Sequence, residues 1–202
     1  MSLSHHRAAF TREDAETRRL ALIEACAACL AEQGIAAASV RTICARAGVS
    51  PGLLRHYFDG IDALVAATYR HVTATVNAAL AAAVAAAPPE PRARLIAYTT
   101  ASFRAPIADP ALLATWIAFW SLVKTDPAIA AIHAETYGGY RDALEALLAE
   151  CGVPAADRHG TAIGLTALVD GLWLELTLDP ASFSADQASA LAVRWVDALL
   201  GG

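Results

Sequence analysis

The chain has 202 residues, of which 56% are hydrophobic, and its formal net charge is −5. This length allows one large or two small domains with a buried core, and the negative charge argues against a uniformly basic nucleic-acid binder. Residues 1–70 hold 8 Lys and Arg against 7 Asp and Glu, whereas the remainder holds 7 against 13. The first third is therefore the part electrostatically suited to DNA.

No segment predicts membrane insertion. The longest uncharged run, residues 71–89, is rich in alanine, whereas a membrane span needs about 20 strongly apolar residues. The N-terminus also lacks the basic and then apolar pattern of a signal peptide. We therefore expect a cytoplasmic protein without a membrane partner.

The first predicted helix has Leu20, Ile23, Ala27 and Leu30 on one face, and Gly34 is expected to end it. Helical periodicity continues through nearly the whole chain, with no sustained alternation of β-branched residues. The sequence therefore predicts an all-α fold.

Two short helices joined by a tight turn are expected next. Ser39 is suited to cap the first and Gly48 to follow its last turn. Ser50 is suited to cap the second, with Pro51 in the first turn, where its missing N–H is not needed. Two such helices, braced by a longer preceding helix, are typical of a helix-turn-helix.

The second short helix is the predicted recognition helix, whose N-terminal residues would face base edges in the major groove. Arg55 can pair bidentately with guanine, His56 can donate or accept a hydrogen bond, and Leu53 can contact a thymine methyl. Gly52 leaves room for close approach, and the hydroxyl groups suit phosphates. An ordinary pair of packed helices has the same periodicity. The predicted DNA-binding residues are Thr42, Ser50, Pro51, Gly52, Leu53, Arg55, His56 and Tyr57.

Further helices are expected in the remainder of the chain. Their predicted positions are residues 61–86, 92–103, 155–178 and 184–200, with two more that begin at Asp109-Pro110 and Asp126-Pro127. The expected domains are a helix-turn-helix domain over residues 1–60 and a helical ligand-binding and dimerisation domain over residues 61–202.

Aromatic residues in the second half predict a ligand pocket. Trp116, Phe119 and Trp120 lie at i, i+3 and i+4, and Trp173 follows Asp170 by three residues. Such stripes are often part of a core, so both interpretations stay open. The predicted ligand-binding residues are Trp116, Phe119, Trp120, Tyr137, Asp170 and Trp173.

An organic cation suits this composition, for example a quaternary ammonium compound such as choline or betaine aldehyde. A trimethylammonium group forms no conventional hydrogen bond and is held by the faces of aromatic rings. Asp170, or Glu175 as the second candidate, would offset its charge.

The last two predicted helices are expected to pair with their copies in a homodimer. Two broad apolar faces at the end of a chain need more cover than one small domain provides. The residues of these faces are Leu165, Val169, Leu172 and Leu176, followed by Leu191, Trp195 and Leu199.

No metal, cofactor or catalytic site is predicted. Cys26 and Cys29 form a CAAC motif near Cys44, and such a group of thiols allows a metal or redox sensor. Within a helix, however, such a motif more often consists of small buried thiols. His159 and Asp170 with a serine would resemble a catalytic triad, yet no nucleophile elbow accompanies them. We therefore expect a protein that is not an enzyme.

The segment SVRTICARAGVSPGLLRHYFDGIDAL, residues 39–64, closely resembles the DNA-binding segment of the TetR family. The resemblance implies a dimeric repressor that binds a palindromic operator and is released by a small inducer. The family usually places a phosphate-binding Lys where this chain has Ile61. A helical small-molecule-binding protein or enzyme with a vestigial headpiece is the alternative, and binding to the DNA upstream of its own gene would distinguish the two.

Two later segments resemble a choline-responsive branch of the same family. They are TWIAFWSLVKTDPAI, residues 115–129, and GLTALVDGLWLEL, residues 164–176. This second resemblance implies that the inducer is choline or a related compound of the glycine-betaine pathway.

Overall fold

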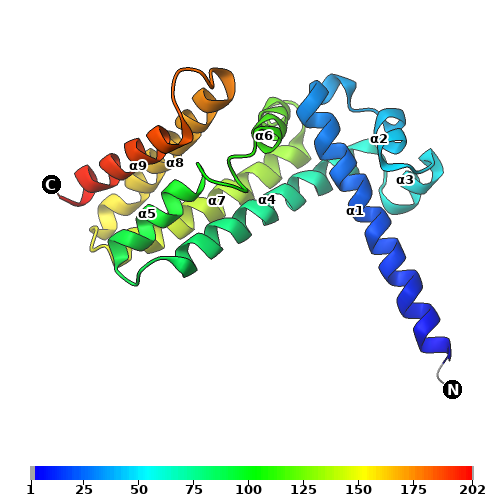
Figure 1. Cartoon of the computed structure of the whole chain (residues 1–202), viewed down its shortest axis with the longest axis horizontal. Helices are drawn as coiled ribbons and strands as arrows, with labels where there is room; N and C mark the ends of the chain where they lie inside the picture. Colours follow the sequence, from blue (N-terminus) through cyan, green and yellow to red (C-terminus); the bar gives the residue numbers. More distant parts are fainter. Residues whose placement is uncertain (1–2, 202) are drawn as a thin grey trace.

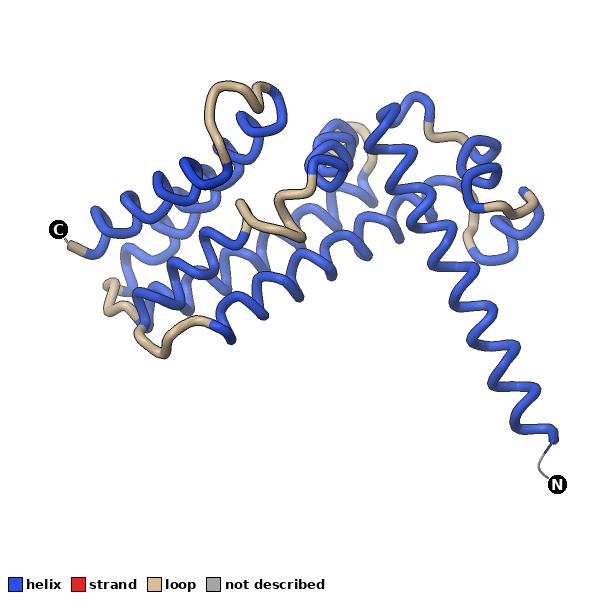
Figure 2. Tube along the Cα trace, in the orientation of Figure 1, coloured by secondary structure: helices blue, strands red, loops and turns tan. Residues whose placement is uncertain are grey.

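The computed structural model describes the backbone of residues 3–201 and the side chains of residues 14–36 and 38–201. Over this part of the chain the secondary structure is helical and contains no strand, which confirms the all-α fold (Figure 2). The helices are α1 (Leu3–Ala37), α2 (Val40–Ala47), α3 (Pro51–Tyr57), α4 (Ile61–Ala86), α5 (Pro91–Ala101), α6 (Pro110–Leu122), α7 (Pro127–Glu150), α8 (Ala155–Leu178) and α9 (Ala185–Leu200).

The helices form two groups along an elongated molecule (Figure 1). Helices α1, α2 and α3 make a small headpiece at one end, and α4 leads from α3 into a bundle with α5, α7, α8 and α9. Helix α6 lies between α1 and this bundle. The headpiece and the bundle are therefore joined both through the chain, by α4, and through packing, by α6 on α1.

Local hydrogen bonds fix the turn between α2 and α3. The Ser39 side chain accepts from the backbone N–H of Thr42, and the Thr42 hydroxyl accepts from the Ser39 N–H at 2.9 Å. Gly48 ends α2 in the left-handed region, at φ 65°, where a residue with a Cβ is disfavoured. Ser50 then caps α3 by accepting from the Leu53 N–H at 3.2 Å. These caps confirm the predicted helix-turn-helix geometry.

Two further predicted starts are also capped by side chains, whereas two predicted ends are shifted. Asp109 and Asp126 each accept two backbone N–H groups at the start of α6 and α7. Gly34 does not end α1: its φ of 66° and ψ of −173° make a kink, and the helix continues to Ala37. Helix α5 ends at Ala101, before the predicted residue 103.

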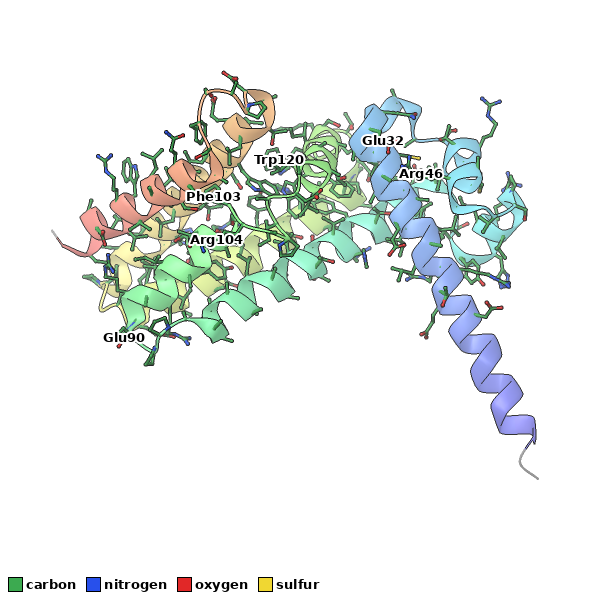
Figure 3. The ribbon with its side chains drawn as sticks, viewed as in Figure 1. Glu32, Arg46, Glu90, Phe103, Arg104 and Trp120 are labelled. Carbon is green, nitrogen blue, oxygen red and sulfur yellow. The ribbon has the colours of Figure 1, made fainter. Side chains whose placement is uncertain are left out.

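The headpiece has its own small core. Ile43 of α2 and Leu54 of α3 are fully buried. The Arg19 guanidinium lies over the Phe58 ring, 5.1 Å from its centre. Glu32 of α1 and Arg46 of α2 face each other (Figure 3) and form a bidentate pair at 2.5 and 2.7 Å. Arg46 lowers the pKa of Glu32 through these hydrogen bonds.

The cysteines of the headpiece are part of this core. Cys26, Cys29 and Cys44 are all buried. Burial raises the pKa of Cys26 to about 11, so the thiol stays protonated at neutral pH. Among the described residues no cluster of three or more His, Cys, Asp or Glu side chains is placed to hold a metal ion.

Helix α8 buries, within its own domain, the face that was predicted to form the dimer interface. Leu165 and Val169 are 2% and 5% exposed, because they pack into the core of their own domain. Ile163 and Leu178 are 47% and 68% exposed. By length and composition alone, α8 is long and apolar enough to cross a membrane. Only 28% of an apolar 18-residue stretch of this helix is buried within the chain. Its uncovered apolar surface therefore lies on the side opposite to Leu165.

Helix α9 leaves the predicted stripe uncovered. Leu191, Trp195 and Leu199 are 36%, 56% and 41% exposed. The intervening Ala192 and Val196 are buried, so α9 packs on its own domain through one face and presents the stripe on another.

Candidate DNA-binding face and ligand pocket

The exposed side chains of α3 form the candidate DNA-binding face. Arg55 and His56 are exposed near the end of α3, and Arg55 makes no ion pair with any described side chain. His56 and Tyr57 are in edge contact, with ring centres 5.1 Å apart. Tyr57 is half-buried against the core of the headpiece. The guanidinium and the imidazole are thus free to reach an external partner.

The predicted phosphate-binding hydroxyls differ in what they can still donate. The Thr42 hydroxyl donates to the Ser39 carbonyl at 2.9 Å, so its proton is used within the capping box. Ser50 uses its oxygen as an acceptor and keeps its proton available. A Cβ added at Gly52 would meet only the Ser50 Oγ, at 3.8 Å, so packing does not require a glycine there. Ile61 packs against the core and offers no cationic contact.

The candidate ligand pocket is a partly open cavity between α4, α6, α7, α8 and the segment that follows α5. Four of the predicted ligand-binding residues line it: Trp116, Tyr137, Asp170 and Trp173. The other lining residues are Val76, Asn77, Ser102, Ile107, Thr136, Tyr140 and Val169. The structure therefore brings residues from five separate segments to one place.

The two tryptophans meet as perpendicular walls. The Trp116 and Trp173 ring centres lie 5.9 Å apart with an interplanar angle of 78°. The Trp173 Nε1–H donates to the Ser102 carbonyl at 2.9 Å, and the Trp116 Nε1–H donates to the Tyr137 hydroxyl at 3.4 Å. Because both indole N–H groups have partners within the protein, the walls offer the cavity ring surface and no free indole donor.

A single carboxylate faces this aromatic corner. Burial has the largest effect on the pKa of Asp170 and raises it to about 6. The nearby Tyr137 hydroxyl and Arg141 lower this pKa, but their effect is smaller. At neutral pH the cavity therefore holds a negative charge that is poorly solvated.

Two predicted ligand residues lie outside the cavity. Phe119 is fully buried and stacks on Tyr69 of α4, with ring centres 4.2 Å apart. Trp120 (Figure 3) lines a neighbouring surface depression together with His133, and this depression shares Tyr137 and Asp170 with the cavity. Trp120 is thus placed on the outer side of the same carboxylate.

Glu175 and His159, the other polar residues that the sequence suggested for a site, do not line the cavity. Glu175 is exposed on α8 and does not line the cavity. His159 bonds to Glu145 at 2.8 Å rather than to Asp170. His159 and Asp170 therefore do not form the catalytic triad that the sequence would allow.

Sequence reasoning missed Tyr140 and Ser102 as lining residues. Tyr140 follows Tyr137 by three residues on α7 and so shares its face, a spacing that is visible in the sequence. Ser102 closes α5, and no periodicity marks it. Its contribution depends on how α5 meets α8 in space.

Direct contacts connect the cavity to the headpiece. Trp116 is in edge contact with Tyr69, whose ring centre lies 5.5 Å away on α4, the helix that follows α3. The hydroxyl of Thr115, the residue that precedes Trp116 on α6, donates to the Ala27 carbonyl of α1 at 3.2 Å. A displacement of Trp116 would therefore act on both connections between the two groups of helices.

Two family models match separate parts of the chain. Residues 22–68 match the model of bacterial regulatory proteins of the tetR family. Residues 91–201 match the model of the BetI-type transcriptional repressor, C-terminal. The two matches fall on the headpiece with the start of α4, and on the bundle from α5 to α9.

Individual relatives agree with these models. The HTH-type transcriptional regulator BetI of Burkholderia thailandensis is 38% identical over 186 residues, which covers 92% of this chain and 94% of that protein. Its counterpart in Paraburkholderia phymatum is 34% identical over the same shares. These relatives are named as transcriptional regulators.

Solved structures share the fold. A transcriptional regulator from Pseudomonas aeruginosa PAO1 superposes with a TM-score of 0.85 at 46% identity, covering 93% of this chain and 92% of its own. A regulator from Saccharomonospora viridis, solved in complex with choline, has a TM-score of 0.81 at 16% identity and covers 90% and 96%. At that identity the second likeness concerns the fold.

Proposed function

The chain belongs to the TetR family of transcriptional regulators, with a BetI-type C-terminal domain, and from this premise we propose that it is a homodimeric repressor released from a palindromic operator by a quaternary ammonium cation such as choline. Residues 1–60 would form the DNA-binding domain and residues 61–202 the ligand-binding and dimerisation domain. The inducer and the dimer go beyond family membership and rest on the observations that follow.

The arrangement of Trp116, Trp173 and Asp170 carries the ligand assignment. Perpendicular indole faces with no free N–H suit a group that cannot form hydrogen bonds, and a trimethylammonium group is of this kind. Each ring face contributes about 0.5–2 kcal/mol to such binding. The buried carboxylate of Asp170 supplies the opposite charge in a region of low dielectric. The choline complex of the Saccharomonospora viridis regulator, which shares the fold, supports this assignment.

The uncovered faces of α8 and α9 support the dimer. Leu191, Trp195 and Leu199 of α9 lie exposed, as do Ile163 and Leu178 of α8, and a second copy would bury them in an isologous four-helix interface. A two-fold dimer would place two α3 helices about one DNA turn apart, or a multiple of it. A palindromic operator is the sequence that such a pair of helices would bind.

The ligand would release the protein from its operator if ligand binding and DNA binding favour different arrangements of the two headpieces. Trp116 contacts the ligand in this proposal, and its neighbours Thr115 and Tyr69 connect α6 and α4 to the headpiece. A coupling free energy of about 1–3 kcal/mol would lower operator affinity about 5- to 150-fold.

A gel shift with DNA from upstream of the protein's own gene tests this function. We expect a retarded complex that choline dissociates and that 3,3-dimethylbutanol, its uncharged isostere, does not. Equal release by the two compounds would refute the cationic inducer, because the isostere has the shape of choline without its charge. Failure to bind any upstream fragment would favour the alternative of a binding protein with a vestigial headpiece.

Arg55→Ala should weaken operator binding by about 1–3 kcal/mol and relax the preference at one base pair per half-site. The reason is that the guanidinium is exposed and unpaired on α3. Arg104→Ala is the matched control, since Arg104 is an exposed arginine in the segment that follows α5, outside the headpiece (Figure 3). Titrations against a panel of operator variants measure both effects. Unchanged affinity of Arg55→Ala for every variant would show that α3 is not the recognition helix.

A further inference from the structure

The cavity contains a polar group that a bare trimethylammonium cation would leave without a partner. Tyr140 of α7 lines the cavity, and its hydroxyl is buried with no hydrogen-bond partner among the described residues. Ser102 is near enough to lower the pKa of Tyr140, yet no hydrogen bond of normal geometry joins the two side chains. A buried hydroxyl without a partner is unfavourable, so a ligand that supplies one gains affinity.

The position and charge state of this hydroxyl are well defined. The Tyr98 ring centre lies 5.1 Å from that of Tyr140, and the Tyr98 hydroxyl donates to the Tyr140 carbonyl at 3.3 Å. Burial raises the pKa of Tyr140 well above its usual value, and the nearby Tyr98 and Asp170 add to this effect. The hydroxyl is therefore neutral, able to donate to an oxygen and to accept from another hydroxyl.

The charges around the cavity restrict what kind of oxygen the ligand can carry. Its described lining includes Asp170 and contains no Lys or Arg. A ligand carboxylate would lie close to Asp170 without a cationic side chain in the lining to offset it, which is unfavourable in a buried site. A neutral hydroxyl or carbonyl oxygen carries no such penalty.

We propose, on the basis of the function proposed above, that the inducer combines a quaternary ammonium group with a neutral alcohol or carbonyl oxygen, and that the Tyr140 hydroxyl binds this oxygen. Trp116 and Trp173 hold the cationic end, and Asp170 balances its charge. Tyr140 is then the residue that distinguishes the ligand from analogues that have lost the oxygen or carry a carboxylate.

Calorimetric titration of the full-length protein with choline and with n-propyltrimethylammonium tests this role, because the two cations differ by a hydroxyl replaced with a methyl group. We expect the parent to bind choline about tenfold more tightly. Tyr140→Phe should lose most of that preference, while its affinity for n-propyltrimethylammonium changes less than about twofold. Glycine betaine should bind the parent at least about tenfold more weakly than choline.

The matched control is Tyr98→Phe, which removes the hydroxyl of a tyrosine that does not line the cavity and should keep the preference for choline. Equal binding of the two cations by the parent would overturn the role of Tyr140 and leave the proposed function standing. A preference that persists in Tyr140→Phe would assign the oxygen to another residue and also overturn it. Binding of neither cation would contradict the proposed function itself, and the two failures are thereby distinguished.

Discussion

A Trp195→Glu, Leu199→Glu double variant is expected to be monomeric and to lose operator affinity by about 100-fold or more. The two side chains are 56% and 41% exposed in the single chain and belong to the α9 stripe of Leu191, Trp195 and Leu199. Two carboxylates placed there would be buried against their copies in a dimer, where unpaired charges are strongly unfavourable. A monomer holds one recognition helix, so it loses the gain of about 10²–10⁴ that simultaneous binding of two half-sites gives.

Light scattering measures the mass of the variant, and a gel shift measures its operator affinity. Ala131→Glu, Ala134→Glu is the matched control, because both alanines are exposed on α7, away from the α9 stripe. The control should remain dimeric, and circular dichroism should show both variants to be helical. A dimer that survives the substitutions in α9 would place the interface on another face.

The helix boundaries could be predicted because their signals are local. Asp109 and Asp126 each precede a proline, and a side chain that accepts the first free N–H groups acts within three residues of itself. The same holds for Ser39 and Gly48 on either side of α2. Gly34 shows the limit of such a signal: it was expected to end α1, and its positive φ does interrupt the helix, yet the helical backbone resumes and continues to Ala37.

The faces of α8 could not be predicted, because that helix is apolar nearly all round. Periodicity identifies Leu165 and Val169 as one apolar face and equally allows a second one through Ile163 and Leu178. Which of them the domain itself covers depends on where α6 and α7 pack, and this is not a local property. The structure buries the first face and leaves the second open.

The aromatic run on α6 divides for a geometric reason. A helix turns by about 100° per residue, so Phe119 and Trp120 lie on opposite sides of Trp116. Trp116 faces the cavity, Phe119 stacks on Tyr69, and Trp120 lines the outer depression. The i, i+3 and i+4 spacing correctly grouped the residues on one broad face but could not show that three different partners lie against it.

Asp170→Asn is expected to weaken choline binding about 100-fold while raising the stability of the free protein. The first effect arises because the cation would enter a buried site without an opposite charge. The second follows from the pKa of Asp170, which rises from 3.8 to about 6 on folding through burial. An ionised group with a raised pKa opposes folding, so its neutral replacement should add on the order of 2 kcal/mol at pH 7.5 and raise Tm by about 4–8 °C.

The pH dependence of the parent provides the second half of this test. The carboxylate is ionised above a pH of about 6 and protonated below it, so affinity for choline should be constant near pH 7.5 and fall toward pH 5. The contribution of Asp170 to the free energy of unfolding runs the other way: it declines as pH rises from 3.8 to about 6 and then stays low. In Asp170→Asn the fall of choline affinity toward pH 5 should disappear, and so should the contribution of residue 170 to the pH dependence of the free energy of unfolding. Calorimetry with choline at a series of pH values measures the first, and thermal unfolding without ligand measures the second. Because a mere loss of folding would lower affinity and stability together, weaker binding combined with a higher Tm can arise only if Asp170 serves the ligand at the expense of the fold.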